Sequence, residues 1–162
     1  ATLAPDLDLF AEVTHISTYF ATQWGEAIAG QPSHADWQTV PAVIFTDPEI
    51  AYVGLTEKQA QEAGYETLVA RHNFAAIGRA LTMGETDGLV KLVADKKTGV
   101  LLGAQMCGPE VSELIGEMTL AIEMGALVED VGLTPHYHPT LSEGILEAAP
   151  TLLHSIEKAS KK

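Results

Sequence analysis

The sequence contains a single cysteine and no long apolar run. Cys107 alone can form neither an internal disulfide nor a CxxC motif, which is typical of proteins in reducing compartments, so we expect a cytoplasmic location. No apolar stretch approaches the roughly 18 residues that a membrane-spanning helix needs. A charged-then-apolar signal segment is also missing from the N-terminal residues. These absences predict a protein that neither spans a membrane nor depends on disulfides.

Basic residues are scarce as well. Nine lysines and arginines face 22 acidic residues, which leaves a formal net charge of −13. The only basic cluster is Lys158, Lys161 and Lys162, at the C-terminal end. An acidic surface repels phosphate backbones, so we expect no nucleic-acid partner.

Several catalytic and cofactor-binding signatures are missing. The chain has no GxGxxG and no GxxxxGK[ST] loop, no nucleophile elbow and no HExxH pair. Backbone loops of the first two kinds hold the phosphates of nucleotides and dinucleotide cofactors. The sequence therefore predicts that this chain binds no such cofactor by itself.

The 162 residues are enough for one compact domain, and 46% of them are hydrophobic. Two apolar runs, 89–94 and 100–107, are joined by a turn-type segment that ends in Gly99, which predicts an antiparallel hairpin. Further strand-like runs lie at 40–45, 50–53 and 68–74, and helical spacing at 13–28 and 110–124. A capping box at Thr56–Gln59 predicts another short helix. We therefore expect an α+β fold, an antiparallel sheet of about four to six strands with helices packed on one face.

The richest titratable segment is His136-Tyr137-His138-Pro139-Thr140-Leu141-Ser142-Glu143. Histidine titrates nearest neutral pH, at about 6.5, and a carboxylate bound to one ring nitrogen leaves the other free for proton transfer. The same residues also fit a capping box, with Thr140 at the N-cap and Glu143 at N3, ahead of an apolar helix. Spacing alone favours the cap over a catalytic pair.

A metal site is a third interpretation of this segment. His136, His138 and Glu143 could be written as three ligands, but no further histidine or cysteine lies at short range. Zinc sites usually combine several such ligands at defined spacings. We therefore predict no bound metal.

Several stretches between residues 40 and 149 resemble one known family. They are FTDPEIAYVG at 45–54, GLVKL at 88–92, GAQ at 103–105, GP at 108–109, ELI at 113–115 and HxHPTxxE at 136–143. In this order they resemble the C-terminal interface domain of the pyridine nucleotide–disulfide oxidoreductases. Within that family they are most similar to the dihydrolipoamide dehydrogenase branch.

The resemblance implies three segments. Residues 40–149 would form the interface (dimerisation) domain. Residues 1–39 would be a helical segment left from a preceding FAD domain, and residues 150–162 a C-terminal tail that Pro150 separates from the helix before it.

The resemblance also implies a role for two residues. His138 would be the catalytic base and Glu143 its partner carboxylate, serving the flavin and disulfide of the other subunit of a homodimer. The parent enzyme would use FAD and NAD, contain a flavin domain that this domain faces, and act on lipoyl-bearing proteins. Without FAD and NAD domains or a cysteine pair, this chain alone would be inactive. A non-catalytic interaction module and the interface domain of another disulfide oxidoreductase, such as glutathione reductase, stay open as alternatives.

Overall fold

The computed structural model describes residues 17, 20–31 and 39–160. Its elements follow one another as β1 (Ala42–Ile44), β2 (Glu49–Gly54), α2 (Glu57–Glu62), β3 (Thr67–Asn73), the short 3₁₀ turn η1 (Phe74–Ala76), α3 (Gly78–Met83), β4 (Leu89–Asp95), β5 (Leu101–Gly108), α4 (Val111–Glu123), α5 (Val128–Leu133) and α6 (Glu143–Ser160). Residues 20–28 form a further helix. This part of the predicted 13–28 helix is confirmed, whereas residues 13–16 and 18–19 lie outside the described residues.

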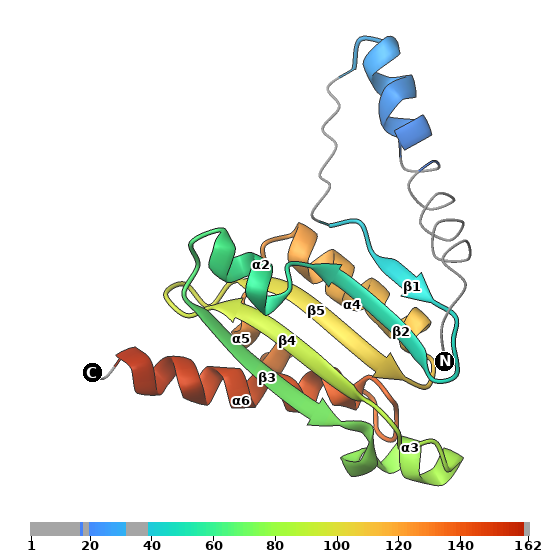
Figure 1. Cartoon of the computed structure of the whole chain (residues 1–162), viewed down its shortest axis with the longest axis vertical. Coiled ribbons are helices and arrows are strands. Elements are labelled where there is room, and N and C mark those ends of the chain that lie inside the picture. The colour runs from blue at the N-terminus through green and yellow to red at the C-terminus, as the bar shows by residue number, and fades with distance from the viewer. Residues whose placement is uncertain (1–16, 18–19, 32–38, 161–162) are drawn as a thin grey trace.

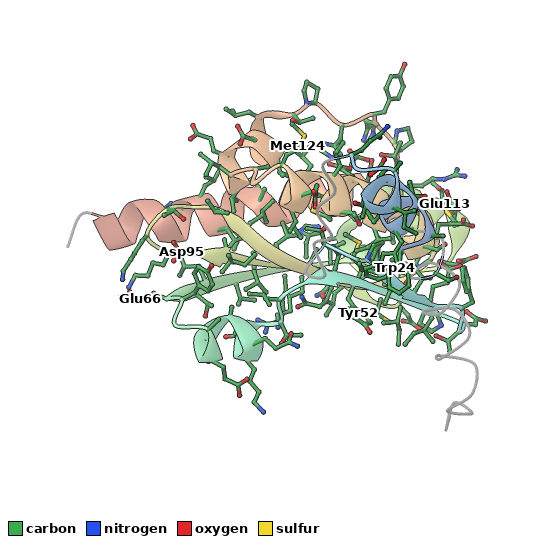
Figure 2. The ribbon with its side chains drawn as sticks, turned by 90° about the horizontal axis from the view of Figure 1, so that it is seen from above. Trp24, Tyr52, Glu66, Asp95, Glu113 and Met124 are labelled. Carbon is green, nitrogen blue, oxygen red and sulfur yellow. The ribbon has the colours of Figure 1, made fainter. Side chains whose placement is uncertain are left out.

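The five strands form one sheet in the order β1-β2-β5-β4-β3, and every neighbouring pair is antiparallel. Helices α4, α5 and α6 cover one face of this sheet (Figure 1). Helix α4 packs over β2 and β5, and α6 packs over β3 and β4. Seen along the sheet in Figure 2, α2 lies on the opposite side. The predicted α+β fold is confirmed, with α2 as an addition to the single helical layer.

The core lies between the sheet and these three helices. Alternate strand residues point into it, as the two-residue period of a strand requires, for example Ala51 and Val53 on β2 and Ala104 and Met106 on β5. Helix α6 contributes Ile145, Ala148, Ala149 and Leu152, all fully buried. None of the helices within the described ranges is both long and apolar enough to cross a lipid bilayer.

Local sequence signals predicted several elements well. The hairpin is β4 and β5, and the apolar 110–124 segment is α4. At the start of α2, Gln59 N donates to the Thr56 hydroxyl and Thr56 N donates to Gln59 Oε1, which confirms the capping box.

The predicted helix break at Pro150 is wrong, because α6 continues through Pro150 to Ser160. Proline leaves the Leu146 carbonyl without its usual donor. Burial of Ala149 on one side of Pro150 and Leu152 on the other keeps both halves in the core, and this packing outweighs the lost hydrogen bond. The expected boundary at residue 149 therefore falls inside a helix.

The hairpin turn contains the buried carboxylate of Asp95, which is 6% exposed (labelled in Figure 2). It accepts hydrogen bonds from the Thr98 hydroxyl at 2.7 Å and from the Thr98 backbone N–H at 3.2 Å. The Thr98 hydroxyl, followed by the backbone N–H groups of Lys97 and Thr98, lowers the pKa of Asp95 although burial opposes the shift. The folded state therefore favours the ionised carboxylate.

We expect Asp95→Asn to lower the free energy of unfolding at pH 7 by about 2 kcal/mol, because an amide cannot accept both hydrogen bonds with the strength of a carboxylate. A carboxyl group whose pKa is lower in the folded state stabilises the fold at pH values above its unfolded pKa of about 3.9. This contribution disappears as the pH falls through the folded-state pKa. Urea unfolding at pH 7 and pH 3 measures both effects. Asp87→Asn is the control, because Asp87 is exposed. An equal loss at both pH values would contradict the expected role of the charge.

Candidate active site

The segment 134–142 connects α5 to α6 and carries the histidine-rich motif. The C-terminal end of this segment leads directly into α6, whose first two residues are Glu143 and Gly144. A Cβ atom on Gly144 would lie 3.2 Å from Val90 Cγ2 and 3.6 Å from Phe74 Cε1. The missing side chain thus allows the first turn of α6, and with it Glu143, to lie directly on the sheet.

His138 and Glu143 form a hydrogen-bonded pair. His138 Nδ1 lies 2.8 Å from Glu143 Oε1. The imidazole is 77% exposed, whereas the Glu143 side chain is 19% exposed. Within the described part of the chain, the other ring nitrogen, Nε2, has no hydrogen-bond partner among the contacts of His138. The structure therefore brings the two predicted site residues together and leaves one nitrogen open.

Glu143 uses its second oxygen to hold the loop. Oε2 accepts a hydrogen bond from the Thr140 backbone N–H at 2.9 Å. This N–H, followed by the hydrogen bond from His138, lowers the pKa of Glu143. Glu143 is therefore an ionised acceptor at neutral pH, so the proton of the Glu143–His138 bond belongs to Nδ1. In the neutral ring, Nε2 then presents its lone pair to solvent.

The predicted capping box at Thr140 is present only in half. Glu143 accepts from the Thr140 N–H as the box requires, but the Thr140 hydroxyl donates to the Tyr137 carbonyl at 2.6 Å. The hydroxyl therefore stabilises the turn of the loop rather than the first helical N–H groups. Cap and histidine pairing are compatible, because each uses a different oxygen of Glu143.

His136 is held differently from His138. Its Nδ1 lies 2.9 Å from the Thr134 carbonyl oxygen, and its Nε2 lies 3.0 Å from Glu117 Oε1 on α4. Its side chain is only 5% exposed. Both ring nitrogens are thus engaged inside the protein.

The contact with Glu117 was not predicted from the sequence. Glu117 precedes His136 by 19 residues and is one of several glutamates on α4, so no local spacing links the two. Among the described residues, no three His, Cys, Asp or Glu side chains converge as a metal site would require. His136 and His138 instead contact different carboxylates.

Comparison with known proteins identifies the domain. A family model described as "Pyridine nucleotide-disulphide oxidoreductase, dimerisation domain" matches residues 40–149, which is more than half of the chain. The chain belongs to this family. Its sheet and helical layer are therefore those of a dimerisation domain.

Relatives of this dimerisation domain occur in both archaea and bacteria. The chain is 54% identical over 137 residues to the dihydrolipoyl dehydrogenase of Halobacterium salinarum, a match that covers 84% of this chain and 29% of the relative. It is 46% identical over 143 residues to the dihydrolipoyl dehydrogenase of Bacillus subtilis, covering 88% of this chain and 30% of that protein. The chain thus spans about three tenths of the length of these relatives.

Solved structures show the same fold. LpdA from Mycobacterium tuberculosis superposes with a TM-score of 0.74 at 29% identity, over 78% of this chain and 28% of LpdA. The flavoprotein disulfide reductase RclA from Escherichia coli superposes with a TM-score of 0.73 at 28% identity, over 80% of this chain and 30% of RclA. The dimerisation domain is therefore similar to one part of larger flavoprotein disulfide reductases.

Proposed function

We propose that this domain completes the active site of an FAD-dependent dihydrolipoamide dehydrogenase, by presenting His138 and Glu143 to the flavin and disulfide of the other subunit of a homodimer. The observation that supports this best is the open Nε2 of His138, on a ring whose Nδ1 is held by an ionised carboxylate. The names of the relatives at 46–54% identity support the choice of substrate class.

The chemistry assigned to the pair is proton transfer. A dihydrolipoyl thiol gives its proton to His138 Nε2 while Glu143 stabilises the resulting imidazolium through Nδ1–H. The thiolate then attacks one sulfur of the partner subunit's disulfide. One S–S bond breaks as a mixed disulfide forms, and the other cysteine leaves as a thiolate.

The residues of this domain do not fit FAD or NAD by themselves. The sequence has no phosphate-binding glycine loop. A groove of about 380 Å³ is lined by carboxylates, among them Asp47, Glu49, Glu85, Asp87 and Glu110. These charges would repel a dinucleotide diphosphate. We assign both cofactors to the rest of a longer parent protein, together with its contacts to lipoyl-bearing proteins.

A homodimer is supported by the outer surface of α4. Leu120 on this helix and Met124 at its C-cap are 61% and 74% exposed, and Met124 points away from the sheet in Figure 2. Beside them runs a groove of about 520 Å³ lined by Val40, Pro41 and Leu120. Large exposed apolar side chains beside such a groove are typical of protein interfaces.

Hybrid dimers of the complete enzyme test whether His138 acts across the interface. One subunit carries His138→Gln with an intact redox cysteine pair, and the other carries intact His138 with both redox cysteines replaced by serine. The hybrid should have about half the lipoamide turnover of the wild-type dimer, because one complete site forms between the subunits. Purification with two different affinity tags, followed by steady-state kinetics, measures this.

Two outcomes would contradict the proposal. Turnover in the hybrid no higher than in either mutant homodimer would mean that histidine and disulfide must lie in one subunit. Full turnover in the His138→Gln homodimer would mean that the domain is a non-catalytic interaction module. Parallel assays with glutathione disulfide and NADPH decide between the lipoamide and glutathione branches.

A further inference from the structure

The first histidine of the motif has no part in the proton transfer described above. Its two neighbours are a backbone carbonyl of Thr134 and the carboxylate of Glu117. A carbonyl only accepts hydrogen bonds, and so does an ionised carboxylate. Both nitrogens of the His136 ring therefore have partners inside the protein, and neither is open to a substrate.

This ring also joins parts of the fold that the chain does not connect directly. Thr134 is the C-cap residue of α5, and Glu117 lies on α4. The other hydrogen bonds of the loop given above link His138 and Thr140 to Glu143, or Thr140 to Tyr137. Of these contacts, only the one to Glu117 reaches an element other than α5 and α6.

We propose that His136 is a positioning residue, which with Glu117 fixes the 134–142 loop on α4 so that His138 points its open nitrogen toward the other subunit. This inference rests on the proposed function, because it gives a reason for the orientation of a catalytic His138. It assigns the two histidines of the motif different tasks, with a buried clamp at 136 and an exposed base at 138.

The electrostatics of the loop support this division. The charge on His136 contributes, after the Thr140 N–H and His138, to lowering the pKa of Glu143. The clamp thus lies near enough to Glu143 to help keep its carboxylate ionised. A general base must lie within about 2.6–3.2 Å of the heavy atom whose proton it accepts, so a small shift of the loop slows the transfer. Misplacement by about 1 Å can lower rates by about 10²-fold.

Substitutions of Glu117 in the complete enzyme test the clamp. We expect Glu117→Ala to lower kcat about tenfold and to change KM less than about twofold, because the loop moves while the rest of the substrate site stays intact. Glu117→Gln should keep most of the wild-type kcat, since its amide oxygen still accepts from His136 Nε2. Glu147→Ala is the matched control, as Glu147 is an exposed glutamate on α6. Sedimentation of each variant checks that the dimer persists.

A spectroscopic measurement on this chain separates positioning from simple stability. Long-range ¹H–¹⁵N spectra report which ring nitrogen of each histidine carries a proton. The His138 signals should show a protonated Nδ1 in the wild type, in Glu117→Gln and in Glu147→Ala. In Glu117→Ala they should move toward an average of the two tautomers, while the melting temperature changes by less than about 4 °C.

The results distinguish failure of this inference from failure of the proposed function. Unchanged kcat and unchanged His138 signals in Glu117→Ala would overturn the inference, as would a loss in Glu117→Gln equal to that in Glu117→Ala. If His138→Gln leaves turnover intact, the proposed function fails instead. The His138 spectra would then still show whether Glu117 orients the ring.

Discussion

Replacing His138 with glutamine is expected to lower the lipoamide turnover of the complete enzyme by about 10³-fold, within the usual range for general acid–base catalysis. Glutamine can still form a hydrogen bond with Glu143 but cannot take a proton from a thiol near neutral pH. The substrate thiol would then ionise without help, and only the small fraction present as thiolate could attack the disulfide. Steady-state kinetics with dihydrolipoamide and NAD measure the loss.

The same variant should keep its flavin content and its thermal stability. The His138 side chain is 77% exposed, and its hydrogen bond is to the Glu143 carboxylate, which also holds the Thr140 N–H. His154→Gln is the matched control, because His154 is an exposed histidine on α6. A His138→Gln enzyme with near-normal turnover would rule out His138 as the base, whereas a loss of flavin would point to a structural role.

The sequence predicted those features that depend on neighbouring residues. The β4–β5 hairpin follows from two apolar runs around a glycine-containing turn, and α4 follows from its continuous apolar pattern. The capping box of α2 likewise depends only on Thr56 and Gln59, which lie three positions apart. For these elements local preference and tertiary packing favour the same structure.

The features that the sequence did not predict depend on contacts between distant segments. Proline inside a helix usually breaks it, yet α6 continues past Pro150 because Ala149 and Leu152 bury both of its halves in the core. Helix α3, with η1 before it, follows β3 in a stretch without a clear apolar period. His136 is held by Glu117, which is one of several glutamates on α4. The sequence does not show which of these glutamates meets His136, because that depends on how α4 and the 134–142 loop pack together.

The candidate site was predicted as a set of residues but not as an arrangement. HxHPTxxE indicated that His138 and Glu143 belong together, and the 2.8 Å contact agrees with that. Spacing alone favoured the cap over a catalytic pair. The structure shows that the two contacts of Glu143 are compatible, because its two oxygens bind different partners.

Glu143→Gln is the second variant with a large expected effect, a loss of roughly 10²-fold in kcat. Both oxygens of Glu143 accept hydrogen bonds, whereas glutamine offers one acceptor and one donor. If its carbonyl accepts from Thr140 N–H, its amide N–H₂ faces His138 Nδ1, which must then accept. The ring proton moves to Nε2, and the open nitrogen no longer has a lone pair for the thiol proton.

The opposite orientation of the glutamine is no better for catalysis. Its carbonyl would accept from His138 Nδ1, but its N–H₂ would face the Thr140 N–H, so the loop would lose its attachment to α6. Kinetics across pH 6–8 measure the effect, with Glu147→Gln on the same helix as control. The lowered pKa of Glu143 keeps the wild-type carboxylate ionised throughout this range, so protonation of Glu143 itself does not contribute to the difference between wild type and variant. If Glu143 served only to hold the Thr140 N–H, as in a capping box, glutamine would replace it with full activity; a normal kcat would therefore reduce Glu143 to that structural role.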